Sequence, residues 1–360
     1  MTTYQARRRA IAEGLAERRL DAMLVALGPN LRYLSGFTGS NGWLLVSAER
    51  SILFTDPRYL IQARQESAGE GCEVRIAKGP ILMAVVSAIA RRRLRLIGYE
   101  PARLTCDVYE ALLKKLPAHT SLRAVEDWIE SQRTIKSADE IELIRRSVVT
   151  NSRAFEQAAT RLRPGMKESD LAAEIEYRMR RLGAEKPSFE TIVASGLRTA
   201  LPHAQPTSAE IRPGLLLVDM GSQQDGYCSD MTRMLFLGKP GRRVTSAYRA
   251  VLEAQLAAID AVRPGARTAD VDRAARRVLQ QHGLDKAFVH STGHGLGLEI
   301  HEPPRIGRRD KSKLAAGMTI TIEPGVYLED FGGIRIEDTV VVTDRGCEIL
   351  TPTPKELRVV

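Results

Sequence analysis

Residues 161–171 read RLRPGMKESDL, and residues 261–271, one hundred positions further on, read AVRPGARTADV. In both stretches a helix-like apolar pattern stops at Arg-Pro-Gly, and a second helix-like segment then ends at a glycine, Gly183 or Gly283. Proline-glycine turns are common after helices, so chance is one account of this match. Because the turn, the following aspartate and the final glycine all agree, we favour an internal duplication. Two such halves facing each other would place a site on their shared axis.

The duplicated region is preceded by a separate unit, so we expect two domains, at residues 1–130 and 133–360. Ser137 and Glu140 have the spacing of a capping box, which marks the first helix of the second domain. In the first domain, alternating apolar patterns indicate an α/β architecture. We expect helices there at residues 4–19, 60–66, 81–92 and 108–116, and strands at residues 22–26, 43–46, 52–54 and 94–98. The glycine-rich residues 35–42 lack the lysine of a phosphate-binding loop and indicate a turn.

Composition excludes several classes of protein. The chain has 360 residues, 43% of them hydrophobic, but no apolar run approaches the roughly 18–20 residues of a membrane span. A net charge of +9 with only 5% aromatic residues argues against a nucleic-acid surface, because such surfaces combine basic and stacking groups. The four cysteines are widely separated, which indicates reduced thiols. With no cleavable signal sequence, these features predict a cytoplasmic protein.

Two acidic segments follow the first copy of the repeat. Residues 215–221 read LLLVDMG, a buried-looking strand that ends near Asp219. Residues 226–233 read GYCSDMTR, and Asp230 stands eleven positions after Asp219 (230 − 219). This spacing suits two adjacent antiparallel strands joined by a short loop. We therefore expect the two carboxylates to lie close together.

The second half contributes a histidine-rich segment and two acidic strands. Residues 290–303 read HSTGHGLGLEIHEP and hold half of the six histidines, while their glycines argue against a helix. In residues 318–324, MTITIEP, a period of two puts Glu323 on the polar face with the threonines. In residues 333–339, GIRIEDT, the same period places Arg335, Glu337 and Thr339 on one face of a single strand.

Carboxylates that converge on apolar strands repel one another and lose hydration, so a cation must offset their charge. Taken singly, Asp219 could be a loop acid and Glu337 could pair with Arg335. Together, four carboxylates and one imidazole, with no thiolate, favour a hard or borderline divalent ion over a structural zinc. They also exceed the needs of one ion, and two ions about 3.5–4 Å apart fit the number of ligands.

The motifs D-x-G, Y-x-S-D-x-T-R, G-H-G-L-G-L-x-x-H-E, T-I-E-P-G and G-x-R-I-E-D resemble those of the pita-bread metallopeptidases, in the branch of aminopeptidase P and prolidase. The resemblance spans residues 133–357. Residues 36–40, GFTGS, and 55–59, TDPRY, are similar to the family's smaller N-terminal domain. The fold that this resemblance implies is an α/β N-terminal domain of the creatinase/prolidase type. It is followed by an α+β pita-bread catalytic domain with a pseudo-twofold duplication.

The resemblance also implies a dinuclear centre, usually manganese, with cobalt or zinc as alternatives. Asp219 would bind one ion, His294 and Glu323 would bind the other, and Asp230 and Glu337 would bridge both. A water held between the ions would attack the scissile carbonyl, with Glu323 as the proton shuttle. By the same carry-over, His203 and His301 would contact the substrate and the tetrahedral intermediate. His290, Tyr327 and Arg335 would surround the proline-side pocket.

The activity implied is hydrolysis of the bond before proline, releasing the N-terminal residue of small peptides with proline in second position. A strict dipeptidase of the prolidase type is the main alternative. Methionine aminopeptidase ranks lower, because that branch typically lacks the N-terminal domain and the arginine motif. A non-catalytic pita-bread binding protein ranks lower still, because all five ligand positions are filled here. The resemblance further implies a homodimer formed through the N-terminal domain, with no membrane or nucleic-acid partner.

Overall fold

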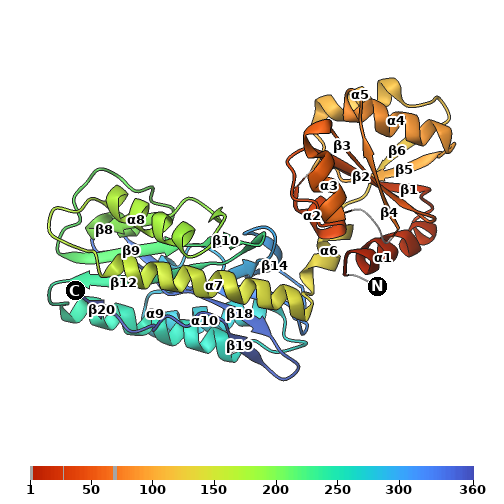
Figure 1. Cartoon of the computed structure of the whole chain (residues 1–360). Coiled ribbons are helices and arrows are strands. Elements are labelled where there is room, and N and C mark those ends of the chain that lie inside the picture. Colours follow the sequence, from red (N-terminus) through yellow and green to blue (C-terminus); the bar gives the residue numbers. More distant parts are fainter. Residues whose placement is uncertain (1–2, 27, 68–70) are drawn as a thin grey trace. The chain divides into compact units, whose positions relative to one another are not determined.

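The computed structural model describes residues 3–26, 28–67 and 71–360, and the chain divides into two compact units after Arg133 (Figure 1). The first unit holds a mixed six-stranded sheet of order β4-β3-β2-β1-β5-β6. Its strands are β1 (Ala22–Ala26), β2 (Gly42–Ser47), β3 (Ser51–Thr55), β4 (Cys72–Ile76), β5 (Leu96–Tyr99) and β6 (Ser121–Ala124). The helices are α1 (Thr3–Glu17), α2 (Gly28–Ser35), α3 (Leu60–Ser67), α4 (Ile81–Arg91), α5 (Cys106–Lys115) and α6 (Trp128–Thr134).

The expected α/β class of this unit is confirmed, although two strands and two α-helices were not expected from the sequence. The two missed strands, β4 and β6, lie at the two edges of the sheet, and β6 is largely exposed. An edge strand needs no continuous apolar run, so the hydrophobic pattern is weak there. The helix α2 is short and contains Pro29 and Asn30, while α6 has only seven residues. Such segments give little helical periodicity.

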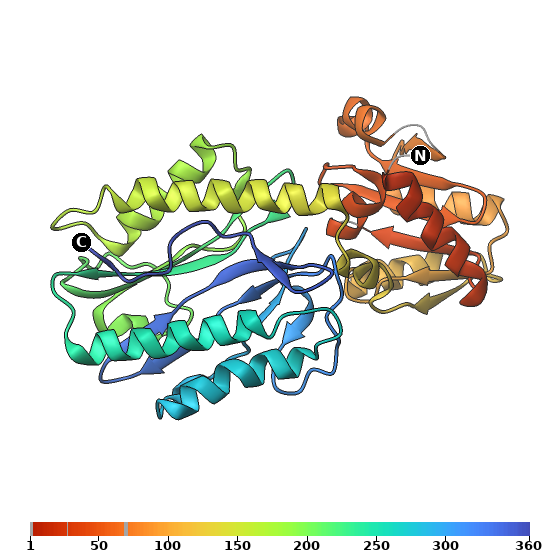
Figure 2. The ribbon, with the colours of Figure 1, turned by 90° about the horizontal axis from the view of Figure 1, so that it is seen from below.

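The second unit carries four long helices around its sheets. They are α7 (Ala138–Ala159), α8 (Glu168–Arg181), α9 (Arg242–Asp260) and α10 (Thr268–Gln281). The predicted capping box at the start of α7 is present, with Ser137 and Glu140 each satisfying a backbone N–H of the other. In Figure 2, α7 lies on one side of the strands and α9 and α10 lie on the other.

Two sheets form the centre of this unit. One has the order β20-β12-β9-β8 and the other the order β14-β13-β15-β18-β19. The strands of the first are β8 (Ile192–Ser195), β9 (Gly214–Met220), β12 (Met231–Leu237) and β20 (Arg358–Val359). Those of the second are β13 (Gly293–Gly295), β14 (Glu302–Ile306), β15 (Thr319–Ile322), β18 (Asp338–Val342) and β19 (Cys347–Ile349). Smaller sheets join β7 (Lys186–Pro187), β10 (Ser222–Gln224) and β11 (Tyr227–Cys228), and pair β16 (Gly325–Leu328) with β17 (Gly332–Arg335).

The internal duplication is visible in backbone hydrogen bonds. Ile211 N donates to Met166 O at 2.8 Å, and Leu314 N donates to Ala266 O at 2.9 Å. An isolated bridge joins residues 167 and 210 in the first half, and another joins residues 267 and 313 in the second. In each half, therefore, the start of the second helix is tied by the same kind of contact to a segment further along the chain.

The leucines of β9 contribute to two hydrophobic cores, one on each face of the strand. Leu215 and Leu217 belong to the core formed with α9, α10 and the second sheet, whereas Leu216 and Val218 belong to the core formed with α7 and α8. Burial on both faces accounts for a continuous apolar run instead of an alternating one. By the same period, Asp219 lies on the face of Leu215 and Leu217, which the second half covers.

The segment of residues 332–342 is not the single strand that the sequence predicts. β17 ends at Arg335, β18 begins at Asp338, and the two strands belong to different sheets. Arg233, which is 2% exposed, occupies the break by donating to the backbone carbonyls of Glu337 and Thr353 and to Asp338 Oδ1. A period of two cannot reveal such a break, because the segments on both sides of it are equally buried and the alternation runs on through residues 334–340.

All four cysteines are free thiols, as expected from their spacing. Among the described residues, no helix combines the length and the apolar character needed to cross a bilayer.

Candidate metal centre

A cavity of about 930 Å³ in the second unit is lined by residues of both halves. The first half contributes Asp219 at the end of β9 and Asp230 directly before β12, on strands that pair antiparallel as expected. The intervening residues form the small β10–β11 hairpin instead of a plain loop. The second half contributes His294, Glu323 and Glu337. His203, His290, His301 and Arg335 line the same cavity.

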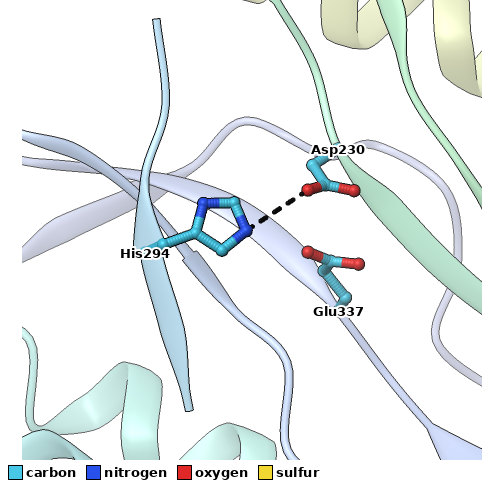
Figure 3. A group of neighbouring side chains, drawn as sticks. All are labelled: Asp230, His294 and Glu337. Atoms are coloured by element: carbon cyan, nitrogen blue, oxygen red, sulfur yellow. Dashed lines mark ion pairs between the residues drawn. The ribbon is translucent and has the colours of Figure 1, made fainter. Parts of the chain in front are cut away.

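Three of the expected ligands form a compact donor set (Figure 3). One ligand atom each from Asp230, His294 and Glu337 lies within 4.8 Å of the others. His294 Nε2 is 3.5 Å from Asp230 Oδ2 and also 3.5 Å from Glu323 Oε1. The imidazole thus stands between two carboxylates that come from distant segments of the chain.

The orientation of His294 suits metal binding. Its Nδ1 is 3.0 Å from the carbonyl of Gly295, so the ring proton occupies Nδ1. The lone pair of Nε2 then faces Asp230 and Glu323. Fixing a ligand histidine through its second nitrogen is the usual way in which proteins set the tautomer at a metal site. Its backbone is held as well, because His294 N donates to Thr321 Oγ1 at 3.1 Å.

Asp219 forms an ion pair with Arg335. Arg335 Nη2 lies 2.6 Å from Asp219 Oδ2, in a buried ion pair. The same guanidinium donates through Nε to Thr232 Oγ1 at 3.0 Å, and Thr232 Oγ1 donates to Glu337 Oε2 at 2.7 Å. Arg335 therefore pairs directly with Asp219, and it reaches Glu337 only through the Thr232 hydroxyl.

A second hydrogen-bond chain leads from Arg335 to His290. Arg335 Nη1 donates to the Tyr327 hydroxyl at 2.7 Å, and that hydroxyl is 2.9 Å from His290 Nε2. His290 Nδ1 lies 2.8 Å from Ser291 O, so Nε2 is the acceptor in this chain. Burial raises the pKa of Tyr327 to about 12, and burial lowers the pKa of His290. Both rings are therefore neutral at neutral pH. Tyr327 stands behind the cavity wall.

The carboxylates carry more negative charge than the protein neutralises. Burial raises the pKa of Asp219, and it raises the pKa values of Asp230 and Glu337 well above their ordinary range, with mutual repulsion adding to the effect. Within the described part of the chain, neither Asp219 Oδ1 nor Glu337 Oε1 has a hydrogen-bond donor. Buried acceptors of this kind need a cation or a proton. The donor set therefore fits divalent metal ions.

His301 and His203 lie at the outer part of the cavity. The ring centroids of His301 and His294 are 4.4 Å apart in an edge-to-face arrangement. Burial, and then the neighbouring His294, lower the pKa of His301, so this ring is uncharged at neutral pH. His203 is exposed on the segment between Ala200 and β9. Among the residues that the structure describes, neither ring has a hydrogen-bond partner that a bound ligand would have to displace.

Two threonines of the site were not identified from the sequence. Thr232 connects Arg335 with Glu337, and Thr321 donates to Glu323 Oε1 at 3.3 Å while accepting from His294 N. A signal for both was present. Thr232 stands two positions after Asp230, and Thr321 stands two positions before Glu323, so each shares a strand face with a ligand.

The duplicated α+β architecture around one carboxylate-rich cavity is the pita-bread fold, and its donor set is that of an enzyme dependent on divalent metal ions. The model of metallopeptidase family M24 matches residues 142–344, and that of the creatinase/prolidase N-terminal domain matches residues 7–135. The chain belongs to metallopeptidase family M24.

The similarity to known proteins covers nearly the whole chain. The Xaa-Pro dipeptidase of Pyrococcus horikoshii is 36% identical over 349 residues, which cover 96% of this chain and 97% of that protein. The solved structure of a Xaa-Pro dipeptidase from Bacillus anthracis matches with a TM-score of 0.94 at 35% identity, covering 99% of both chains. That of an X-Pro aminopeptidase from Thermotoga maritima matches with a TM-score of 0.90 at 36% identity, covering 96% of this chain and 99% of the other.

Proposed function

We propose that the protein hydrolyses the peptide bond that precedes proline and releases the N-terminal residue of small Xaa-Pro peptides. The observation that carries this proposal is the convergence of Asp230, His294 and Glu337 in one cavity, beside Glu323 and Asp219. Relatives named Xaa-Pro dipeptidase and X-Pro aminopeptidase support the choice of bond. They also support keeping both a strict dipeptidase and an aminopeptidase P as forms of the activity.

The site would hold two ions, for which we propose manganese. Asp219 would bind one ion, His294 and Glu323 the other, and Asp230 and Glu337 both. When bound, two divalent ions lower the pKa of a water between them and polarise a carbonyl group. The buried Arg335–Asp219 pair keeps one carboxylate oriented, and Thr232 does the same for Glu337. The chain thus presents a prepared donor set to the ions.

Glu323 is the best placed group for proton transfer. It lies 3.5 Å from His294 Nε2, and Thr321 holds one of its oxygens. The bond before proline is a tertiary amide without an N–H, so the departing ring nitrogen must receive a proton. We propose that Glu323 takes the proton of the attacking water and passes it to this nitrogen.

The outer histidines would act on the substrate. As an uncharged ring, His301 can donate one N–H to the oxygen that becomes negative during attack. His203 would contact the same part of the substrate from the opposite half of the repeat. His290 and Arg335 would form the wall that receives the proline ring, and Tyr327 behind them would hold both through its hydroxyl. The N-terminal domain, residues 1–130, would limit access and form a homodimer.

The test is peptide cleavage by metal-stripped protein before and after addition of manganese. Ala-Pro and Ala-Pro-Ala would be compared, with Ala-Ala as the control for the proline requirement. We expect manganese to restore cleavage of a proline peptide and not of Ala-Ala. The Asp230→Ala variant should bind less metal and lose activity, because it removes a ligand shared by both ions. Cleavage of Ala-Ala at the same rate, or full activity of the variant, would contradict the proposal.

A further inference from the structure

A second hollow adjoins the metal cavity beside His290. It has a volume of about 890 Å³ and is lined by α10, the short helix at residues 285–287 and the loop that follows β14. His290, Ser291, Arg305 and Asp310 line both the hollow and the metal cavity, so the two lie side by side. A space of this size accepts a ligand of several residues.

The hollow is strongly basic. Four of its cationic side chains are exposed, and no ion pair or hydrogen bond to them occurs among the described residues: Lys286, Arg305, Arg308 and Arg309. The acidic groups on its lining are Asp285 and Asp310. Asp310 accepts hydrogen bonds from Thr268 Oγ1 at 2.8 Å and from Ser312 N at 2.7 Å, and the charge of Arg305 helps to lower its pKa, so Asp310 offsets part of the charge of Arg305. Positive charge therefore exceeds negative charge, and that excess is available to a ligand.

Arg276 holds one wall of the hollow in place and connects this wall with the segment of His290, which lines the metal cavity. Its Nε is 2.7 Å from Asp272 Oδ2, and its Nη1 donates to Phe288 O at 2.9 Å. The guanidinium lies 4.1 Å from the centre of the Phe288 ring, and its Nη2 donates to His290 O. The segment that carries His290 is thus held against the same wall that faces the basic side chains.

We propose that this hollow is an extended subsite for peptides with acidic residues after the proline, recognised through Lys286, Arg308 and Arg309. The inference rests on the proposed function, which places His290 on the proline side of the scissile bond. Chain that continues beyond the proline then enters the hollow from the metal cavity. Glutamate or aspartate side chains at the next two positions would meet unpaired cations there. The subsite would favour acidic peptides longer than a dipeptide.

The experiment compares the manganese-loaded enzyme on Ala-Pro, Ala-Pro-Glu-Glu and Ala-Pro-Gln-Gln. At low salt we expect a KM about fivefold lower for the glutamate peptide than for the glutamine peptide, as a few exposed ion pairs would supply. The kcat values should be similar, because the contacts are remote from the scissile bond. Salt should reduce the difference, since exposed charges are screened at high ionic strength.

Two double variants distinguish the effect of charges in the hollow from the effect of the protein's net charge. Arg308→Glu/Arg309→Glu should reverse the preference between the tetrapeptides and leave Ala-Pro hydrolysis unchanged. Arg242→Glu/Arg249→Glu is the matched control, because both arginines are exposed on α9 and line none of the described pockets. This control should keep the wild-type preference, although the net charge changes by the same amount.

The outcomes distinguish this inference from the function on which it rests. Cleavage of Ala-Pro without cleavage of either tetrapeptide, or with equal KM values for both, would overturn the subsite and leave the proposed function intact. A short DNA duplex that binds through Arg308 and Arg309, with no preference among peptides, would assign the hollow to nucleic acid instead. If none of the three peptides is cleaved, both the proposed function and the subsite are overturned.

Discussion

At the scale of single residues, the Thr232 hydroxyl connects the guanidinium of Arg335 with the carboxylate of Glu337. Removing that hydroxyl while keeping its volume, with Thr232→Val, would leave Glu337 Oε2 without its donor and free Arg335 Nε. Outer contacts of this kind typically change metal affinity by about 10- to 100-fold. We expect manganese binding to weaken by about tenfold, measured by titration of the stripped protein. Thr232→Ser, which keeps the hydroxyl, should bind manganese as the wild type does.

Glu100 in the first unit gives a prediction that is independent of the metal centre. Burial raises the pKa of Glu100 to about 7, although a hydrogen bond from the Asn30 side chain acts in the opposite direction and lowers it. The folded protein therefore binds this proton more tightly than the unfolded chain does. Stability should fall as the pH rises from about 4.5 to about 7, by about 3 kcal/mol for a shift of this size.

The measurement is the thermal midpoint of the Glu100→Gln variant and of the wild type across this pH range. Glutamine keeps the shape of the neutral acid, so the variant should equal the wild type near pH 4.5 and be more stable at about pH 8. Glu110→Gln, at an exposed position on α5, serves as the control and should follow the wild type. A wild type that stays as stable as Glu100→Gln at high pH would show that Glu100 ionises without cost.

At the scale of secondary structure, the glycines around His294 let strands approach more closely than side chains allow. A Cβ atom at Gly293 would lie 1.9 Å from Thr321 O, and one at Gly295 would lie 2.3 Å from Pro303 O. β13 can therefore pair with β14 and β15 only with glycine at these positions. This explains the glycine-rich pattern that the sequence shows beside the histidine.

Gly293→Ala should lower stability and metal binding together. Forcing the strands apart costs roughly 1–3 kcal/mol, as overpacking of a core does, and it displaces His294. The thermal midpoint and the manganese affinity of the variant would be compared with those of Gly346→Ala, where a new Cβ meets open space. Gly346→Ala should resemble the wild type. Normal manganese affinity in Gly293→Ala would mean that the strand spacing does not position the histidine.

At the scale of the whole molecule, the two halves of the repeat face each other with their buried acids between them. Without a cation, burial keeps the pKa values of Asp230 and Glu337 raised, so the stripped protein gains stability from protons as the pH falls. Metal ions would replace those protons at higher pH. The thermal midpoint should therefore drop on metal removal, and the drop should be larger at about pH 8 than at about pH 5.5.

Calorimetry of the stripped and manganese-loaded protein checks this. A thousandfold excess of metal over its dissociation constant corresponds to about 4 kcal/mol, or about 10 °C for a unit of this size. In the stripped double variant Asp230→Asn/Glu337→Gln, the acids are neutral isosteres, so most of the pH dependence should disappear. An equal drop at both pH values would show that proton binding by these carboxylates does not limit the stability of the stripped protein.

Much of this architecture could be predicted along the chain, because it depends on local rules. The turns at residues 163–165 and 263–265, the capping box at Ser137 and the run before Asp219 are read from neighbouring residues. They identified the helices, the duplication and the convergence of acidic strands. The motifs led to the family, and the family matches confirm it. The roles of the individual site residues remain predictions.

Other features depend on residues that are distant in the chain, and no local pattern contains them. Arg335 pairs with Asp219, 116 positions away, and Arg233 separates β17 from β18 by binding carbonyls more than one hundred residues further on. The basic hollow joins α10 to the loop after β14. Periodicity assigns a side chain to a face, whereas burial and hydrogen bonding across the fold select its partner. Only the packed structure could therefore show which charges are satisfied and which remain free for a ligand.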